Sequence, residues 1–483
     1  MIKRTSQDIR RLNRFEVLRR VYAGPGAMSR QDIAAATGLS FATVANLTAE
    51  LLEAGVLVEA GHEDSSGGRP RARLAVNAER GALIGVDIAE TSVHAELFDL
   101  ALEVRHSVER PLPPGDVRPS DVVDVLAGCV EELLSGSGVP RERVLGAGVS
   151  VPGMVEREGG VSSFSPYWSW HEVPLRALLD ERLGLPLWLD NPLRASTVAE
   201  LWFGAGREVD DLVVLTLRAG VGAGIAIDGQ LYRGFTNSAG EWGHTCIALD
   251  GRLCTCGNRG CVEAYVSTRG IARTWRELAP DDERATGTGA RAGTGTGTEA
   301  GPGPEAGPGP GTGAGPGTGP GQGQGPRQGQ GPRQGQGPRQ DDAATVAALA
   351  RAAAEQDPTA AAVIDRTGRY LGAAVANLVN LFNPRVLVLG NQVVDLLGER
   401  LLTATYEAVT RHALPLPHRA ATLRRSAVPH NAVTRGAATF ALEGFLNDRE
   451  VFGPVSRMRQ PRERREGRES REGRRAGSAD AEA

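Results

Sequence analysis

The sequence predicts an α/β protein in two parts, a small winged helix-turn-helix followed by a larger α/β region. Three observations predict it. The chain has 483 residues, which suits two or three domains. Helical periodicity and then two short strands fill residues 8–78, and strand and helix patterns alternate through residues 80–283 and 342–448. Residues 284–341 and 449–483 show neither pattern, being rich in Gly, Pro and Gln or in Arg and Glu.

The 284–341 insert and the 449–483 tail lack core-forming side chains. The insert ends in repeats of GQGPRQ, and the tail mixes arginine with glutamate. Without apolar side chains, neither segment can offset the entropy of ordering, so we expect both to be disordered. An insert within a domain is tolerable because the entropy of loop closure grows only with the logarithm of its length.

The composition is that of an ordinary soluble protein. Hydrophobic residues make up 41% and charged residues 23% of the chain, and the formal net charge is −4. The first 20 residues are rich in arginine and do not resemble a signal peptide. No stretch approaches the roughly 20 apolar residues of a membrane helix. We expect a cytoplasmic protein without membrane contact.

Two short helices joined by a turn at Gly38 predict a helix-turn-helix. Ser29 and Asp32 have the spacing of a capping box at the start of the first helix. Ser40 is placed to cap the second helix, which ends before Gly55. In such a motif the second helix reads DNA. The candidate reading side chains are the small polar groups of this helix: Ser40, Thr43, Asn46 and Thr48.

A wing is predicted directly after the second helix. The strands Val56–Glu59 and Arg71–Val76 flank a polar loop, Gly61–Pro70, that carries the letters SSGGRPR. Arg69 and Arg71 are suited to phosphate or minor-groove contact. The alternative is a helical interaction module that never touches DNA. Further basic residues are expected to add to the electrostatic footprint on DNA: Arg4, Arg10, Arg11, Arg14, Arg19 and Arg20.

Five cysteines are present, and three of them are clustered. The clustered residues are Cys254, Cys256 and Cys261, whereas Cys129 and Cys246 stand apart. A reducing compartment disfavours structural disulfides, so the cluster is better interpreted as a set of metal ligands.

Five motifs together resemble the ROK family. They are the GGRP of the wing, the strand GVDIAETS, the loop GVGAGIAIDGQLYRG, the run GEWGH and the cluster CTCGNRGCVEAY, and they follow one another in family order. The resemblance covers nearly the whole chain outside the insert and the tail. It implies a two-lobed actin-like ATPase fold after the winged helix-turn-helix. The family contains both sugar kinases and sugar-sensing repressors.

The resemblance also implies a zinc site. The family carries one histidine and three cysteines in the arrangement seen here at His244, Cys254, Cys256 and Cys261. One imidazole and three thiolates suit a closed tetrahedral site, so we expect a structural Zn²⁺. Buried free cysteines are the alternative.

Catalytic residues of the family's kinases are missing. Ala89 and Glu90 replace the glycines of the first phosphate turn, and a carboxylate there repels a triphosphate. Arg218 and Ala219 stand where the kinases place Gly and Thr. Alignment on the downstream Ala-Glu puts Pro192 at the catalytic Asp, and proline cannot accept a proton. The sequence therefore predicts a degenerate kinase that is not an enzyme.

Sugar-contacting residues are partly kept. Asn191, Glu241 and His244 match the family, whereas Tyr167 replaces an asparagine. Tyr167 and two neighbouring tryptophans offer faces on which a sugar ring can stack.

Three functions stay open. The first is a sugar-responsive repressor of carbohydrate-metabolism genes that binds a pseudo-palindromic operator as a homodimer or homotetramer. The second is a repressor without a small ligand. The third is a glucokinase-like sugar kinase with an accessory DNA-binding arm, which the proline at position 192 disfavours.

Overall fold

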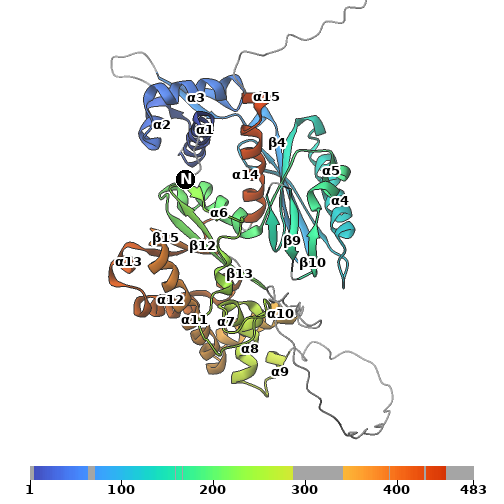
Figure 1. Cartoon of the computed structure of the whole chain (residues 1–483), viewed down its shortest axis with the longest axis vertical. Coiled ribbons are helices and arrows are strands. Elements are labelled where there is room, and N and C mark those ends of the chain that lie inside the picture. Colours follow the sequence, from blue (N-terminus) through green and yellow to red (C-terminus); the bar gives the residue numbers. More distant parts are fainter. Residues whose placement is uncertain are drawn as a thin grey trace, which may run out of the picture.

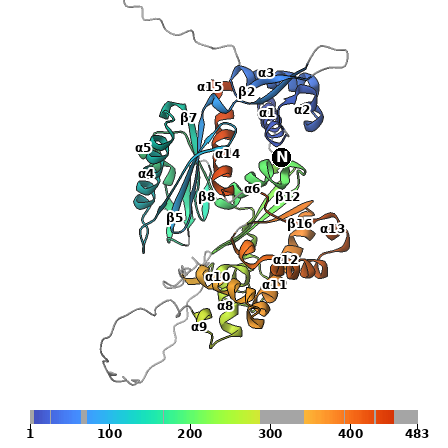
Figure 2. The same ribbon diagram turned by 180° about the vertical axis from the view of Figure 1, so that it is seen from behind.

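The computed structural model describes residues 5–24, 26–63, 71–157, 159–165, 167–286, 341–390, 392–428 and 431–452. A small N-terminal head lies at one end of the molecule, and two α/β lobes make up the rest (Figures 1 and 2). Most of the predicted insert and tail, and the wing tip with Arg69, lie outside the described residues.

The head is a winged helix-turn-helix. Its elements are α1 (Ser6–Ala23), β1 (Met28–Ser29), α2 (Arg30–Thr37), α3 (Phe41–Glu53), β2 (Leu57–Glu63) and β3 (Arg71–Val76), with the strands in the order β1-β3-β2. The capping box of Ser29 and Asp32 is present, and Gly38 adopts the left-handed conformation after α2. Ser40 caps α3, and Gly55 follows it with a φ of 71°. The predicted helix-turn-helix is confirmed.

The first lobe is built on a five-stranded sheet of order β11-β7-β4-β5-β6. Its elements are β4 (Ala82–Ile88), β5 (Ser92–Asp99), β6 (Val104–Pro111), α4 (Pro119–Ser137), β7 (Val144–Ser150), α5 (Leu175–Leu183) and β11 (Leu187–Asp190). A separate small sheet holds β8 (Met154–Glu156), β9 (Val161–Ser165) and β10 (Trp170–Val173).

The second lobe repeats this strand order. Its sheet runs β16-β15-β12-β13-β14, and in both lobes three antiparallel strands are followed by two parallel ones. The elements are β12 (Leu212–Leu217), β13 (Val221–Ile227), β14 (Gln230–Leu231), η4 (Glu241–His244), α7 (Glu263–Val266), α8 (Thr268–Leu278), α9 (Glu283–Thr286), α10 (Asp341–Ala354), α11 (Pro358–Phe382), β15 (Val386–Gly390), α12 (Gln392–His412), α13 (Pro415–Ala420) and β16 (Thr422–Arg425). The two matching sheets are the predicted two-lobed α/β architecture.

Two helices form the layer between the sheets. α14 (Ala432–Leu446) packs on β4 and β7 of the first lobe, and α6 (Pro192–Phe203) packs on β12 and β13 of the second (Figure 1). Glycines allow α14 to lie very close to its neighbours. A Cβ on Gly148 would lie 1.7 Å from the carbonyl oxygen of Ala437, and a Cβ on Gly436 would lie 1.9 Å from that of Ala195.

Two short helices extend the ordered structure a few residues into the predicted insert and the predicted tail. α9 extends to Thr286 because Ala285 is fully buried in the second-lobe core. After α14 the chain forms α15 (Arg449–Phe452), where Phe452 lies under the guanidinium of Arg14 at 4.2 Å from the ring centroid. Both segments therefore begin with a few ordered residues that make core contacts.

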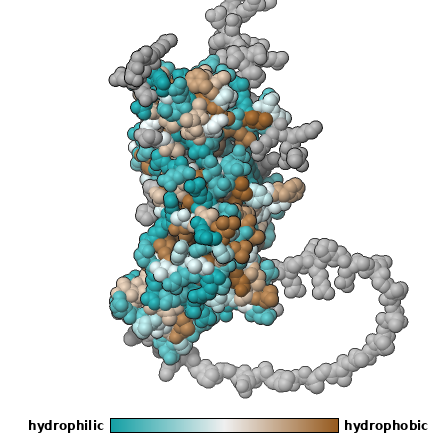
Figure 3. All heavy atoms as spheres, turned by 90° about the vertical axis from the view of Figure 1, so that its left-hand side faces the viewer, coloured by the Kyte–Doolittle hydropathy of each residue, from teal (hydrophilic) through white to brown (hydrophobic). Residues whose placement is uncertain are grey.

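Within the described part of the chain, no helix has the length and apolarity needed to cross a bilayer. On the face in Figure 3, hydrophobic side chains lie in several separate patches among hydrophilic ones.

We predict that Gly436→Ala destabilises the protein because the added methyl group forces α14 away from α6. The free energy of unfolding should fall by about 1–3 kcal/mol, as for other overpacked cores. Gly128→Ala, also inside a helix, meets only the tip of the Arg110 side chain and is the matched control. Denaturant unfolding of both variants checks this. Equal stabilities would contradict the close contact of the two helices.

Candidate functional site

The head presents part of α3 to solvent. Ser40 and Asn46 are exposed and Thr43 is half-buried, so these three predicted reading residues lie on the accessible side of the helix. Ser40 is also engaged locally, because its hydroxyl accepts the Thr43 backbone N–H at 3.1 Å. Arg71 is exposed at the start of β3.

Thr48 does not belong to this surface. Its side chain is fully buried, its hydroxyl donates to the Ala45 carbonyl at 3.1 Å, and it accepts Nε of Arg30 at 3.1 Å. Thr48 lies one turn from both Val44 and Leu51, which are core residues of the head. Its assignment as a base-reading residue is therefore wrong.

Most of the basic residues predicted to add to the footprint on DNA are engaged within the protein, although Arg11 is exposed on α1 and Arg4 lies outside the described residues. Arg14 and Arg19 are buried, and Arg10 and Arg20 are paired with acidic side chains. Their partners lie within the protein, so most of the positive charge of α1 is neutralised internally.

A cleft of about 1570 Å³ lies between the two lobes, next to the beginning of α6. It is lined by the end of β4, the turn between β12 and β13, the first turn of α6, and η4. All four residues predicted to contact a sugar line this cleft: Tyr167, Asn191, Glu241 and His244.

Asn191 is both a cleft residue and the N-cap of α6. Its Oδ1 accepts the backbone N–H of Arg194 at 2.9 Å. Asn191 directly follows β11, which ends at Asp190. Burial raises the pKa of the Glu241 carboxyl, and the nearby His244 and Arg194 oppose this. Ser165 lines the same cleft with a buried hydroxyl that has no hydrogen-bond partner among the described residues. The cleft thus offers several polar groups that a hydroxylated ligand can engage.

Pro192, the residue that the sequence aligns with the catalytic Asp of the kinases, is placed at the start of a helix. Pro192 is the first residue of α6, where a missing N–H costs nothing and the fixed φ suits the helix. The neighbouring Asp190 is engaged by two arginines. It pairs with Arg194 Nη1 at 2.8 Å and with Arg233, and both it and Arg194 are only 3% exposed.

The two turns that the sequence compares with the phosphate turns of kinases both line the cleft. In the first lobe Glu90 follows the end of β4, and in the second Arg218 follows β12. Arg218 reaches Asp87 at 3.9 Å, while burial raises the pKa of the Asp87 carboxyl. A contact between charged side chains of the two lobes therefore crosses the cleft.

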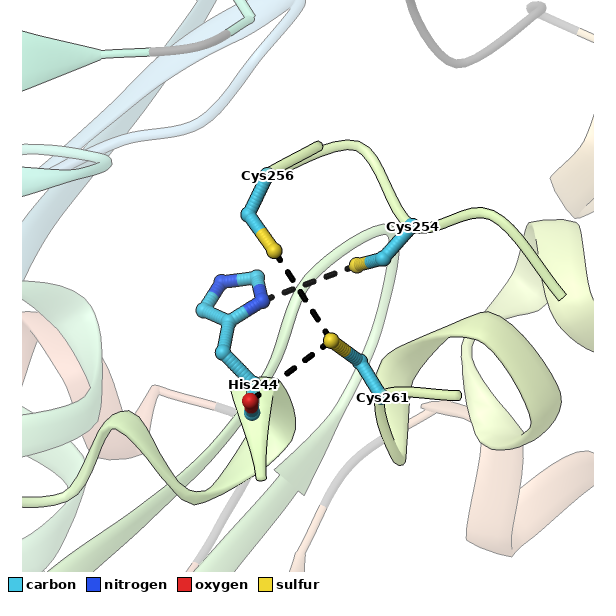
Figure 4. A group of neighbouring side chains, drawn as sticks. All are labelled: His244, Cys254, Cys256 and Cys261. Atoms are coloured by element: carbon cyan, nitrogen blue, oxygen red, sulfur yellow. Dashed lines mark hydrogen bonds between the residues drawn. The ribbon is translucent and has the colours of Figure 1, made fainter. Parts of the chain in front are cut away.

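The four predicted metal ligands come together (Figure 4). Their ligand atoms all lie within 4.8 Å of one another. Cys254 Sγ is 3.6 Å from His244 Nδ1, and Cys256 Sγ is 3.7 Å from Cys261 Sγ. Tetrahedral bonds of about 2.3 Å to sulfur and about 2.0 Å to nitrogen give ligand separations of about 3.8 and 3.5 Å. These two measured separations match those of a tetrahedral metal site.

A model of the ROK family matches residues 83–443, three quarters of the chain. The chain belongs to the ROK family. A second model, the IclR helix-turn-helix domain, matches residues 13–61 of the head. The ROK match spans both lobes and the cleft.

Relatives of this ROK protein share both of its parts. A xylose repressor of Caldicellulosiruptor bescii is 28% identical over 439 residues, 91% of this chain and 97% of the relative. The DNA-binding transcriptional dual regulator NagC of Escherichia coli K12 is 24% identical over 422 residues, 87% of this chain and 90% of the relative. A solved ROK family transcriptional regulator, a homologue of the E. coli MLC protein, has the same fold with a TM-score of 0.66, at 24% identity over 90% of this chain and 97% of that one.

We predict that Asp190→Asn destabilises the protein by about 3–5 kcal/mol, because the buried Arg194 and the half-buried Arg233 then lack a counter-charge. The two guanidinium groups outweigh burial and hold the pKa of Asp190 below its usual value. The ionised form thus stabilises the fold above the ordinary Asp pKa of about 3.9, and this contribution is lost as the pH falls below it. Urea unfolding from neutral to acid pH should show that loss in the unmodified protein alone.

Asp365→Asn is the matched control, since it breaks an exposed pair with Arg400. Its cost should stay within about 1 kcal/mol. Equal losses for the two variants would show that the Asp190 cluster is not a buried ion network.

Proposed function

We propose that this protein is a DNA-binding transcriptional repressor of carbohydrate-metabolism genes, with operator binding modulated by a sugar held between its lobes. One observation carries the proposal: an exposed reading helix is fused to a sugar-kinase-like cleft whose base position is Pro192. The names of the relatives, a xylose repressor and NagC, agree with this combination.

Operator recognition is assigned to Ser40, Thr43 and Asn46 on α3 and to Arg71, with Arg69, on the wing. Amide side chains such as Asn46 can form paired hydrogen bonds with adenine in the major groove. One head covers only part of a groove, so a homodimer or homotetramer on a pseudo-palindromic operator supplies the remaining contacts.

The sugar is assigned to Asn191, Glu241, His244 and Tyr167. Amide, carboxylate and imidazole groups bind hydroxyls directionally, and the Tyr167 ring offers an apolar face. Because His244 turns Nδ1 toward Cys254, its Nε2 remains for the cleft. A sugar at this nitrogen would contact the metal cluster through one side chain.

A structural zinc is assigned to His244, Cys254, Cys256 and Cys261. Three thiolates and one imidazole suit Zn²⁺, which would tie η4 to the loop before α7. With four protein ligands, no coordination position is left for a reacting water.

We predict that Asn46→Ala relaxes the base preference at one operator position by about 1–3 kcal/mol. Arg71→Ala should instead weaken binding to all sequences and lower the salt slope by about one. The operator is first selected from random double-stranded DNA with the full chain, and affinities are then measured at several salt concentrations. Gln230→Ala, an exposed change in the second lobe, is the control. Unchanged affinity, preference and salt slope in both head variants would contradict this DNA interface.

We predict about one zinc per chain in purified protein, by elemental analysis. Cys256→Ser should lose the metal and lower the melting temperature, since metal binding stabilises the folded state. Cys246→Ser changes an exposed cysteine outside the cluster, and this variant should keep both the metal and the melting temperature. A metal-free chain with full stability would refute the zinc assignment.

We predict no sugar phosphorylation. The base is missing at Pro192, Glu90 repels phosphate, and Asp190 is held by two arginines. A coupled assay over hexoses, pentoses and N-acetylated sugars tests this. Turnover in the ordinary enzyme range of about 1–10³ s⁻¹ would favour the kinase instead.

A further inference from the structure

One helix, α6, connects the cleft to the DNA-binding head. Its cap Asn191 and its first residue Pro192 line the cleft, as does Glu200 two turns later. The helix has 12 residues, which spans about 18 Å. Figures 1 and 2 show it lying between the lobes, with its far end beneath α1.

The far end of α6 packs directly against the head. Trp202 is fully buried, and its ring lies 4.8 Å from Phe15 and 5.3 Å from Tyr22, measured between ring centroids. Both partners belong to α1. A shift of α6 along or about its axis therefore displaces these α1 side chains, because close-packed rings leave no free space.

The segment after α6 holds α1 by polar contacts. Arg19 donates to Asp210 at 2.6 Å and to the carbonyl of Gly206 at 3.3 Å. Arg207 donates in return to the carbonyl of Ala23 at 3.0 Å. Movement of α6 thus reaches α1 through hydrogen bonds as well as through aromatic packing.

α1 in turn holds the reading helix. Arg14 pairs with Glu50 of α3 at 2.9 Å, and Arg10 pairs with the same carboxylate. Glu50 lies one turn after Asn46 on α3. A continuous series of contacts therefore leads from Asn191 in the cleft to the DNA-reading surface.

The junction of head and core contains imperfectly satisfied donors. Trp202 Nε1, Arg14 Nε and Arg435 Nε are buried and lack hydrogen-bond partners among the described residues. They come from α6, α1 and α14, the three helices that meet there. Unpaired buried donors destabilise the arrangement that buries them, which leaves room for a second arrangement of similar free energy.

We propose that α6 couples the cleft to the head, and that Trp202 is the positioning residue through which occupation of the cleft changes the placement of α1 and α3. This inference rests on the proposed function. A ligand hydroxyl bound by Asn191 competes with the cap that the same side chain provides for α6. The first turn of the helix then shifts, and the shift is passed on at Trp202.

The test is a double-mutant cycle read by hydrogen exchange of the full chain. Asn191→Ala removes the cap of α6 and is the perturbation made in the cleft. It should speed amide exchange in α1 and α3 on the order of fivefold or more, the lower range for coupled sites. In a Trp202→Phe background this increase should fall to within about twofold, the limit expected for independent changes.

Trp275→Phe is the matched control. Trp275 is also fully buried with an unpartnered indole N–H, but it lies on α8, away from the head. It should leave the effect of Asn191→Ala intact. If Asn191→Ala lowers the melting temperature of the whole chain, Asn191→Ser is the milder substitution. It should produce a smaller increase of amide exchange in α1 and α3, with the same dependence on Trp202.

Two results would overturn the inference. One is exchange in α1 and α3 that does not respond to either Asn191 variant. The other is an equal loss of response with Trp202→Phe and Trp275→Phe. Because exchange is measured without DNA, a chain that shows the coupling yet binds no DNA would refute only the proposed function.

Discussion

The packing of α6 between α14 and the second sheet is the constraint on which the rest of the molecule depends. α6 supplies one wall of the cleft at its beginning and the seat for α1 at its end. α14 also connects the cleft to the head. Val433, near its beginning, lines the cleft, and the carbonyl of Leu446, at its end, accepts a hydrogen bond from Arg14 of the head. Close approach at Gly436 fixes the two helices against each other. Cleft and head are therefore parts of one packed structure.

The same constraint explains how a kinase-like cleft can serve regulation. Pro192 cannot act as a base, yet it is well suited to the first turn of a helix. Arg194 is unavailable for substrate because it neutralises Asp190. Arg218 reaches Asp87 across the cleft. Pro192, Arg194 and Arg218 thus take part in contacts that fix the helix and bridge the lobes.

The sequence predicted those features that depend on local chemistry. Capping at Ser29 and Ser40, the left-handed glycines after both helices and the bounds of β3 follow from neighbouring residues alone, and the structure agrees. The short spacing of Cys254, Cys256 and Cys261 likewise predicted that these side chains lie together, and the structure agrees.

Tertiary contacts were not predictable in the same way. Thr48 looked like a reading residue because it is polar, but its helical phase with Val44 and Leu51 turns it inward. The arginines of α1 looked like DNA contacts, whereas Arg19 pairs with Asp210, about 190 residues away in the chain. The Asp190–Arg194 pair joins the end of β11 to α6, and Arg233 comes from a distant loop, so the helical spacing rule did not apply to this cluster.

If the cleft and the DNA-binding head form one folded unit, a ligand in the cleft changes operator binding. Operator affinity of the full chain, measured with and without saturating D-xylose, D-glucose or N-acetyl-D-glucosamine, tests it most directly. At least one sugar should bind and change operator affinity on the order of fivefold or more. A sugar that binds the cleft by calorimetry and leaves operator affinity unchanged would contradict it.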